Sequence, residues 1–260
     1  MRTTAHIIVI ALAASSAAAQ PLKAKVDAVG SGTVRFSYAA AEGVCGNGRG
    51  NISIRQNGRG TTSYGEGRRG REWEDECEPG PVRIAVDVSR GTVTSLRSYV
   101  GGRWRGTSDT DLGTVSASDA SEYLLTLAES GRNEVAKDAI FPAMIAEGAS
   151  PWRRLLAIAK DQRRPDEVRK SAIFWVGQGA AEAATVGLQE IVDDPNGDRE
   201  VRKSAIFSIS QRPHDESVPA LIRIARSHRD PELRRTAIFW LGQSHDPRAV
   251  AYFEEVLISK

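Results

Sequence analysis

One eleven-residue sequence motif, called the phrase below, occurs three times and constrains the fold of this chain more than any other feature. It reads VRKSAIFWVGQ at Val168–Gln178, VRKSAIFSISQ at Val201–Gln211 and LRRTAIFWLGQ at Leu233–Gln243. A weaker copy, VAKDAIFPAMI, occupies Val135–Ile145, and successive copies begin 33, 33 and 32 residues apart. A self-similar period of this length predicts a repeat array in which each unit is one supersecondary element.

Each phrase has the pattern of a helix. Its apolar positions, Val168, Ala172 and Val176 in the first strong copy, recur four residues apart and make one stripe. A second apolar segment lies between copies and is clearest at 217–225, where apolar residues stand at i, i+3, i+4 and i+7. Helix-start signals precede the strong copies at Pro165-Asp166, Asp198-Arg199 and Asp230-Pro231. The unit is therefore predicted to be a helical hairpin, and a last helix is expected from Pro247 to about Ile258.

These residues resemble the short HEAT repeats first described in phycobilisome lyases, whose pattern is Asp, then Val-Arg, then Ala, then Leu/Val-Gly. The pattern is matched by Asp166, Val168-Arg169, Ala172 and Val176-Gly177, and again by Asp230, Leu233-Arg234, Ala237 and Leu241-Gly242. The resemblance covers roughly residues 118–260 and implies an all-α HEAT-type solenoid. It also implies that Arg169, Arg202 and Arg234 pair with neighbouring-turn carboxylates at Asp166, Asp198 and Asp230. HEAT arrays serve many unrelated tasks, so the resemblance predicts the fold rather than the function.

The N-terminal residues 1–19 have the layout of a secretory signal peptide. Arg2 precedes an apolar run from Ile7 to Ala14, and three alanines end the segment before Gln20. The run is too short to span a bilayer, which takes about 20 residues. We therefore expect an exported protein, periplasmic or secreted, without a transmembrane segment after processing.

The two cysteines, Cys45 and Cys77, both precede the repeats. In an oxidising compartment such a pair is expected to form a disulfide. Two cysteines are too few for a structural zinc site, and no histidine lies in the same segment.

Residues 20–105 carry no helical repeat and are predicted to form a small, disulfide-tied β domain. Apolar residues alternate at 33–38, 51–55 and 82–88, and Ser89-Arg90-Gly91 leads into a further run at 92–100, which indicates a β-hairpin. The small polar residues 106–117 have the composition of a linker, and Asp119 is expected to open the first helix. The predicted fold is thus α+β and multidomain, with the β domain followed by the all-α solenoid at 118–260.

An Arg-Gly stretch at 46–71 could bind phosphates. An acidic cluster at Glu72–Glu78 follows it at once, and the net charge is only +2. A solvated, self-paired loop is favoured, although a binder of cell-envelope polyanions stays open as an alternative.

No motif of a nucleophilic, phosphate-binding or dinucleotide-binding site is present, and no cofactor is expected. His214-Asp215 and His245-Asp246 recur at turns and are predicted to be capping turns rather than metal ligands. We expect a non-enzymatic protein-interaction scaffold whose partner is another protein and not nucleic acid. The repeat resemblance leaves a lyase-like chromophore or small-ligand binder as an alternative.

A helical projection from Val168 places Trp175 in the core, and it places one cation, one phenylalanine and one glutamine on the opposite face. In successive units this predicts three rows, which are Lys170, Lys203 and Arg235; Phe174, Phe207 and Phe239; and Gln178, Gln211 and Gln243. Lys137 and Phe141 continue the first two rows. The resemblance puts these rows on the concave side, where they would suit an extended acidic or aromatic segment of a partner. The competing interpretation is that each Phe fills the gap between successive helices, with only the cations exposed.

Overall fold

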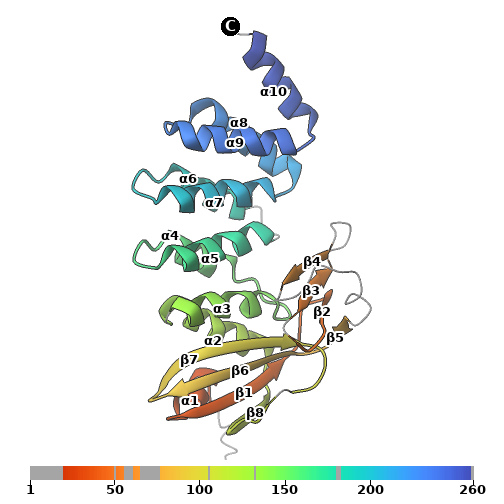
Figure 1. Cartoon of the computed structure of the whole chain (residues 1–260), viewed down its shortest axis with the longest axis vertical. Coiled ribbons are helices and arrows are strands. Elements are labelled where there is room, and N and C mark those ends of the chain that lie inside the picture. The colour runs from red at the N-terminus through yellow and green to blue at the C-terminus, as the bar shows by residue number, and fades with distance from the viewer. Residues whose placement is uncertain are drawn as a thin grey trace, which may run out of the picture.

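The computed structural model describes residues 20–49, 51–55, 61–64, 77–104, 106–131, 133–179 and 183–258. The predicted signal peptide, half of the Arg-Gly stretch and most of the acidic cluster lie outside the described residues. Figure 1 shows a stack of helices with a β-sheet at one end and α10 projecting from the other. The predicted fold class, a disulfide-tied β region followed by a helical solenoid, is confirmed.

The helical hairpins follow the repeat. They pair α2 (Ala117–Ser130) with α3 (Asn133–Met144), α4 (Trp152–Lys160) with α5 (Asp166–Gln178), α6 (Ala183–Asp193) with α7 (Arg199–Ser210) and α8 (His214–Ser227) with α9 (Pro231–Gln243). The last helix, α10 (Pro247–Ile258), follows without a partner among the described residues. The second helices α3, α5, α7 and α9 pack on one another in order, and the first helices α2, α4, α6, α8 and α10 do the same (Figure 1). The stripe predicted from the phrase is buried, since Val168, Ala172 and Val176 are fully inaccessible.

The sheet at the N-terminal end has the strand order β7-β6-β1-β8. Its strands are β1 (Gly32–Tyr38), β6 (Val82–Ser89), β7 (Thr92–Val100) and β8 (Thr110–Thr114). The predicted hairpin is β6–β7, and its turn residues Arg90 and Gly91 both have positive φ, 50° and 70°. Both residues are left-handed, as the tight turn types that match strand twist require.

The segment predicted to be a linker, 106–117, differs from that prediction. Residues Thr110–Thr114 form β8, which pairs in parallel with β1 at the edge of the sheet. Asp111 binds Arg35 of β1 at 2.7 Å, and this ion pair holds a strand with only one apolar residue. The first helix begins at Ala117 rather than at Asp119, because the Ser116 hydroxyl accepts a hydrogen bond from the Asp119 amide at 3.0 Å.

The sheet covers the first hairpin of the array. Phe36 and Tyr38 point from β1 to the helices and are fully buried, and the Phe36 ring lies 6.0 Å from that of Tyr123 in α2. The Tyr38 hydroxyl donates to the Pro142 carbonyl near the end of α3 at 2.6 Å. Burial raises the pKa of Tyr38 well above its usual value. A six-residue helix, α1 (Leu22–Asp27), also packs against α2. The sheet and the array therefore share one hydrophobic core.

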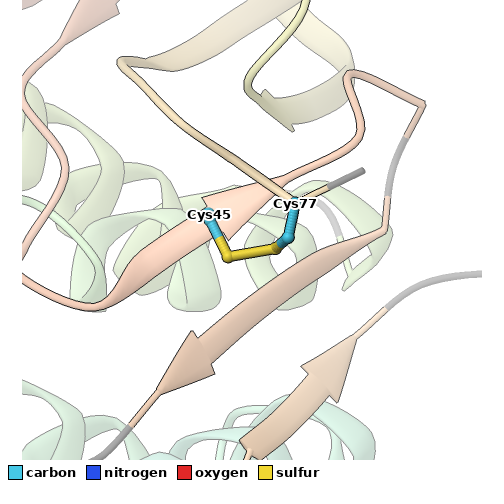
Figure 2. The surroundings of a disulfide bond; sticks show 2 residues. All are labelled: Cys45 and Cys77. Atoms are coloured by element: carbon cyan, nitrogen blue, oxygen red, sulfur yellow. A yellow bond between two sulfur atoms is a disulfide. The ribbon is translucent and has the colours of Figure 1, made fainter. Parts of the chain in front are cut away.

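A second small sheet stands beside the helices, with strand order β4-β3-β2-β5 (Figure 1). It consists of β2 (Val44–Gly46), β3 (Ile52–Arg55), β4 (Thr61–Tyr64) and β5 (Glu78–Pro79). Figure 2 shows the disulfide that joins Cys45 in β2 to Cys77 just before β5, with Sγ atoms 2.08 Å apart. The predicted disulfide is confirmed. Among the described residues, no helix has both the length and the hydropathy needed to cross a membrane.

Candidate partner-binding face

The three predicted rows lie on α5, α7 and α9, and we call their nine residues the second-helix face. They are Lys170, Lys203, Arg235, Phe174, Phe207, Phe239, Gln178, Gln211 and Gln243. Because successive second helices pack side by side, residues one period apart come to lie next to one another. The array thus gathers positions that are 32 or 33 residues apart in the sequence.

The aromatic row belongs to a continuous ladder of rings. Phe141 stacks on Trp175 with centroids 4.9 Å apart, and Phe174 lies 5.1 Å from Trp175 and 6.5 Å from Phe207. Phe207 then contacts Trp240 at 5.0 Å, and Trp240 contacts Phe239 at 5.0 Å. The ladder crosses from α3 to α9.

The rings are not equally exposed. Phe174 and Phe207 are half-buried between successive second helices, whereas Phe239 is 58% exposed. The two inner rings therefore fill gaps between helices and still present an edge to solvent. Sequence reasoning placed Trp175 in the core, and it is buried at 5% exposure. It did not anticipate that Trp175 and Trp240 would join the phenylalanines into one ladder, because that contact runs between units.

The cationic row is paired along its whole length. Each cation binds the Glu three residues before it, in the pairs Lys137–Glu134 at 2.8 Å, Lys170–Glu167 at 3.4 Å, Lys203–Glu200 at 3.0 Å and Arg235–Glu232. In the two central pairs the glutamate is the more exposed partner, 78% against 31% for Glu167 and Lys170 and 61% against 33% for Glu200 and Lys203. The face therefore carries a row of ion pairs in place of the bare cationic row that the sequence indicated. The carboxylate is the more exposed partner in each pair except the last, where Arg235 is 70% and Glu232 45% exposed.

The amide row lies at the C-terminal ends of the second helices. Gln178 is half-buried, whereas Gln211 and Gln243 are exposed. The Gln211 amide donates to the Ser210 hydroxyl at 3.1 Å. These side chains can donate and accept hydrogen bonds with an extended backbone laid across the helices.

The opposite side of the array is occupied by ion pairs that join consecutive first helices. They are Arg154–Glu129 between α4 and α2, Lys160–Glu190 between α4 and α6, Arg223–Asp193 between α8 and α6, and Arg226–Glu255 between α8 and α10. Every step between first helices is bridged in this way. On the second-helix face, by contrast, each ion pair lies within one helix. The side chains of this face that contact the next unit are therefore those of the aromatic ladder.

The phrase arginines make only part of the carboxylate ladder that the resemblance implied. Arg169 donates to the Ala159 carbonyl at 3.0 Å, Arg202 to the Val192 carbonyl at 2.8 Å and Arg234 to the His228 carbonyl at 2.7 Å. These carbonyls end the first helix of the same hairpin, where free acceptors and the helix dipole favour a cation. Arg169 comes within 3.6 Å of Asp166, but that carboxylate belongs to its own helix. Asp230 instead pairs across units with Arg199, at 3.2 Å.

Of the two His-Asp turns, His214-Asp215 and His245-Asp246, only the second provides the predicted helix cap. Asp246 caps α10 by accepting from the Arg248 amide at 2.9 Å, as predicted, and Arg248 lowers the pKa of that carboxyl to about 2. Asp215 does not cap α8, whose preceding residue is Pro213 without a side-chain cap. Within the described residues, no cluster of three or more His, Cys, Asp or Glu side chains could hold a metal ion.

Sequence reasoning missed a buried arginine. Arg212, at the turn between α7 and α8, donates to the Thr185 hydroxyl at 3.0 Å, to the Gly179 carbonyl and to Glu216 at 3.0 Å. Its partners come from three consecutive hairpins. The repeat does not predict this arginine, because the equivalent position is Gly179 in the preceding unit and Ser244 in the following one.

Comparison with known proteins supports the repeat assignment. The family model of HEAT repeats matches residues 187–260, from within α6 to the last residue. The same phrase continues upstream in α5 and, weakly, in α3, so the repeat region extends beyond the matched residues. No curated protein matches the chain.

Proposed function

We propose that this protein is an exported, non-enzymatic interaction scaffold whose second-helix face binds an extended segment of a partner protein. HEAT repeats are protein-interaction scaffolds in general terms. The observation that carries the proposal for this face is the aromatic ladder from Phe141 to Phe239, with ion pairs on one side and amides on the other.

The spacing of the ladder suits an extended chain. Packed helices lie about 8 to 10 Å apart, and an extended strand rises about 3.3 Å per residue. Every third residue of a bound segment would therefore meet the next unit. Apolar or aromatic side chains at that spacing could contact the exposed ring edges, and the amide row could bind the segment's backbone.

The charges favour an aromatic segment over an acidic one. Each cation of the face already has a carboxylate partner, and Glu167 and Glu200 project further into solvent than Lys170 and Lys203. An acidic segment would meet these carboxylates first. Basic residues that flank the aromatic positions would instead be attracted to them.

Export is supported by two features. Residues 1–19 have the layout of a signal peptide, and the Cys45–Cys77 disulfide is consistent with an oxidising compartment. The absence of a recognisable nucleophile motif in the sequence favours a binding role over catalysis.

Site-specific photo-crosslinking in the exporting cell tests the proposal. A photoreactive amino acid replaces Gln211, which is exposed on the second-helix face, or Val186, which is 57% exposed on α6. We expect a discrete crosslinked band from position 211 and none from position 186. No adduct at 211, or the same adduct at both positions, would contradict the proposed face.

A charge-exchange variant tests the charge pattern without removing the ion pairs. It combines Glu167→Lys with Lys170→Glu and Glu200→Lys with Lys203→Glu. The pairs within α5 and α7 persist, but a lysine replaces the first-turn glutamate of each helix, so stability should fall by about 1 kcal/mol. The crosslink at 211 should weaken, because the outermost charges are reversed. An unchanged crosslink would show that the charges of this face take no part in binding.

A further inference from the structure

The two ends of the array differ in what covers them. At the N-terminal end the sheet buries the first hairpin beneath Phe36 and Tyr38. At the other end, no described residue covers α9 and α10 on their outer side. Six of the seven large apolar side chains exposed in the described parts of the chain lie on these two helices. Solenoids normally end in a unit with a polar outer face, because bare repeat surfaces associate.

Comparison of equivalent positions in successive units shows which side of α9 is exposed. Ile173 and Ile206 are fully buried by the next unit, whereas Ile238, one period later, is 40% exposed. A Cβ added to Gly177 in α5 would lie 2.8 Å from the Ser208 Cβ of α7. A Cβ added to Gly242, the equivalent of Gly177 in α9, would meet nothing within 4 Å. The outer side of α9 thus keeps the features of a surface on which another helix packs.

The last helix shows the same pattern. At the 32-residue spacing that separates α7 from α9, Val250 and Val256 correspond to Val218 and Ile224 of α8. Val218 and Ile224 are fully buried, whereas Val250 is 54% and Val256 46% exposed. Each inner first helix is covered by the second helix of its own hairpin, and α10 has no such helix among the described residues. We call the exposed side formed by Ile238, Gly242, Val250, Val256 and Leu257 the terminal face.

We propose that the terminal face is a self-association surface, on which α10 of a second copy of this chain packs in the position that a second helix holds in the inner hairpins. The two helices of every hairpin in the array run antiparallel. A twofold axis between two α10 helices also makes them antiparallel, so each α10 can serve as the partner of the other. The interface continues the packing already established between α5, α7 and α9.

Two further observations favour a symmetric dimer. The array of one copy cannot continue onto the N-terminal hairpin of another, because the sheet already covers that hairpin. Head-to-tail association of the arrays is therefore blocked. The remaining arrangement pairs the C-terminal end of one copy with the C-terminal end of the other. Residues 246–258 and α9 together carry three arginines and four carboxylates, so no large charge of one sign opposes their pairing.

Sedimentation velocity of the purified full chain tests the proposal over about 1 to 100 µM, a range that brackets ordinary interface affinities. We expect a concentration-dependent dimer. Val256→Asp should weaken dimerisation by about thirtyfold or more, as expected for a charge placed inside an interface. Its thermal stability in dilute solution should stay nearly unchanged, because Val256 is already half exposed in the single chain. Val186→Asp, on an equally exposed apolar residue of α6, is the matched control and should leave the dimer intact.

A second variant tests the antiparallel arrangement. About a centre at Phe253, residue 250 of one copy faces residue 256 of the other. Val250→Lys combined with Val256→Asp should therefore recover much of the dimer that each single variant loses. A chain that stays monomeric to 100 µM would overturn the proposal, as would a dimer that Val256→Asp and Val186→Asp affect equally. A double variant as monomeric as the single ones would overturn the antiparallel pairing.

Discussion

Arg212 joins three hairpins at a point where the sequence gives no sign of a special residue. Its side chain is 3% exposed and is bound to Glu216, which is itself 17% exposed. The Thr185 hydroxyl donates to the same carboxylate, so removal of Arg212 leaves a mostly buried charge and two glycine carbonyls with fewer donors. A buried ion pair is costly to break because the partner's desolvation is no longer compensated.

We therefore predict that Arg212→Ala lowers the free energy of unfolding by about 3 to 5 kcal/mol. The matched control is Arg163→Ala, since Arg163 also pairs with a carboxylate, Asp161, but is 90% exposed. That substitution should leave the melting curve nearly unchanged. Urea denaturation followed by circular dichroism measures both. Equal effects would mean that burial of the pair carries no extra stability.

For single residues, the sequence predicted contacts that follow from the pattern within one helix, and it did not predict contacts that depend on neighbouring helices. The stripe of Val168, Ala172 and Val176 was predicted because helical spacing appears within one copy of the phrase. The carboxylate partner implied for Arg169 is only part of its environment, since Asp166 lies 3.6 Å away and the Ala159 carbonyl that ends α4 accepts a hydrogen bond from the same guanidinium at 3.0 Å. A local pattern does not say which of two acceptors is nearer.

Two of the second helices, α7 and α9, begin at aspartate caps. The Asp198 carboxylate accepts from the Val201 amide at 3.1 Å and the Glu200 amide at 2.8 Å, and these backbone hydrogen bonds lower its pKa. The same cap recurs at Asp230, which accepts from the Glu232 amide at 2.8 Å. Asp166 was expected to do likewise, but α5 begins after Pro165 without a side-chain cap.

We predict that Asp198→Ala costs about 1 kcal/mol at neutral pH, the usual loss for an N-cap. Asp198→Asn should retain most of the cap without its charge. A carboxyl whose pKa is lower in the folded state adds stability above its unfolded pKa of about 3.9, and this stability is lost as pH falls through the folded value. The difference in unfolding free energy between the parent and Asp198→Asn should therefore shrink between pH 5 and pH 2. A difference that is constant over that range would contradict the role of the charge.

The helices and the central strands were predictable because their apolar periods are long and regular. The elements that were missed are short or irregular. Strand β8 has one apolar residue in five and is held by its edge pairing to β1, and α1 has only six residues. Of the candidate face, the nine residues and their alignment in rows follow from the period, whereas the ion pairs with glutamate and the two tryptophan contacts depend on how the units stack.

At the scale of the molecule, the sheet serves as the N-terminal cap of the solenoid. Tyr38 reaches across the junction to the Pro142 carbonyl, and the Ala41 amide donates to the Ile145 carbonyl at 2.8 Å. The end of α3 is thus completed by the β region. The composition of residues 106–117 indicated a linker between two domains, whereas the hydrophobic core is continuous from the sheet to the array.

We predict that Tyr38→Phe lowers the free energy of unfolding by about 1 to 3 kcal/mol, because the buried Pro142 carbonyl loses its donor. Tyr123→Phe is the control, since the Tyr123 hydroxyl is buried without a hydrogen-bond partner in the described structure. Its removal should be neutral or slightly stabilising. Thermal unfolding followed at the helical signal measures both. A loss no larger for Tyr38→Phe than for Tyr123→Phe would show that the junction does not depend on this bond.

The parallel pairing of β1 with β8 sets an order in which the molecule can assemble. The amide of Thr33 binds Asp109, 76 positions along the chain, so this edge cannot close until residues beyond the β6–β7 hairpin are available. The hairpin and the helical units, by contrast, form contacts between near neighbours and can fold as soon as each is complete. Refolding should therefore show fast recovery of the helical signal and slower closure of the sheet over α2. Until residues 109–114 reach β1, the backbone of that edge lacks its partner, so the β8 edge should be the last part of the sheet to gain protection from hydrogen exchange.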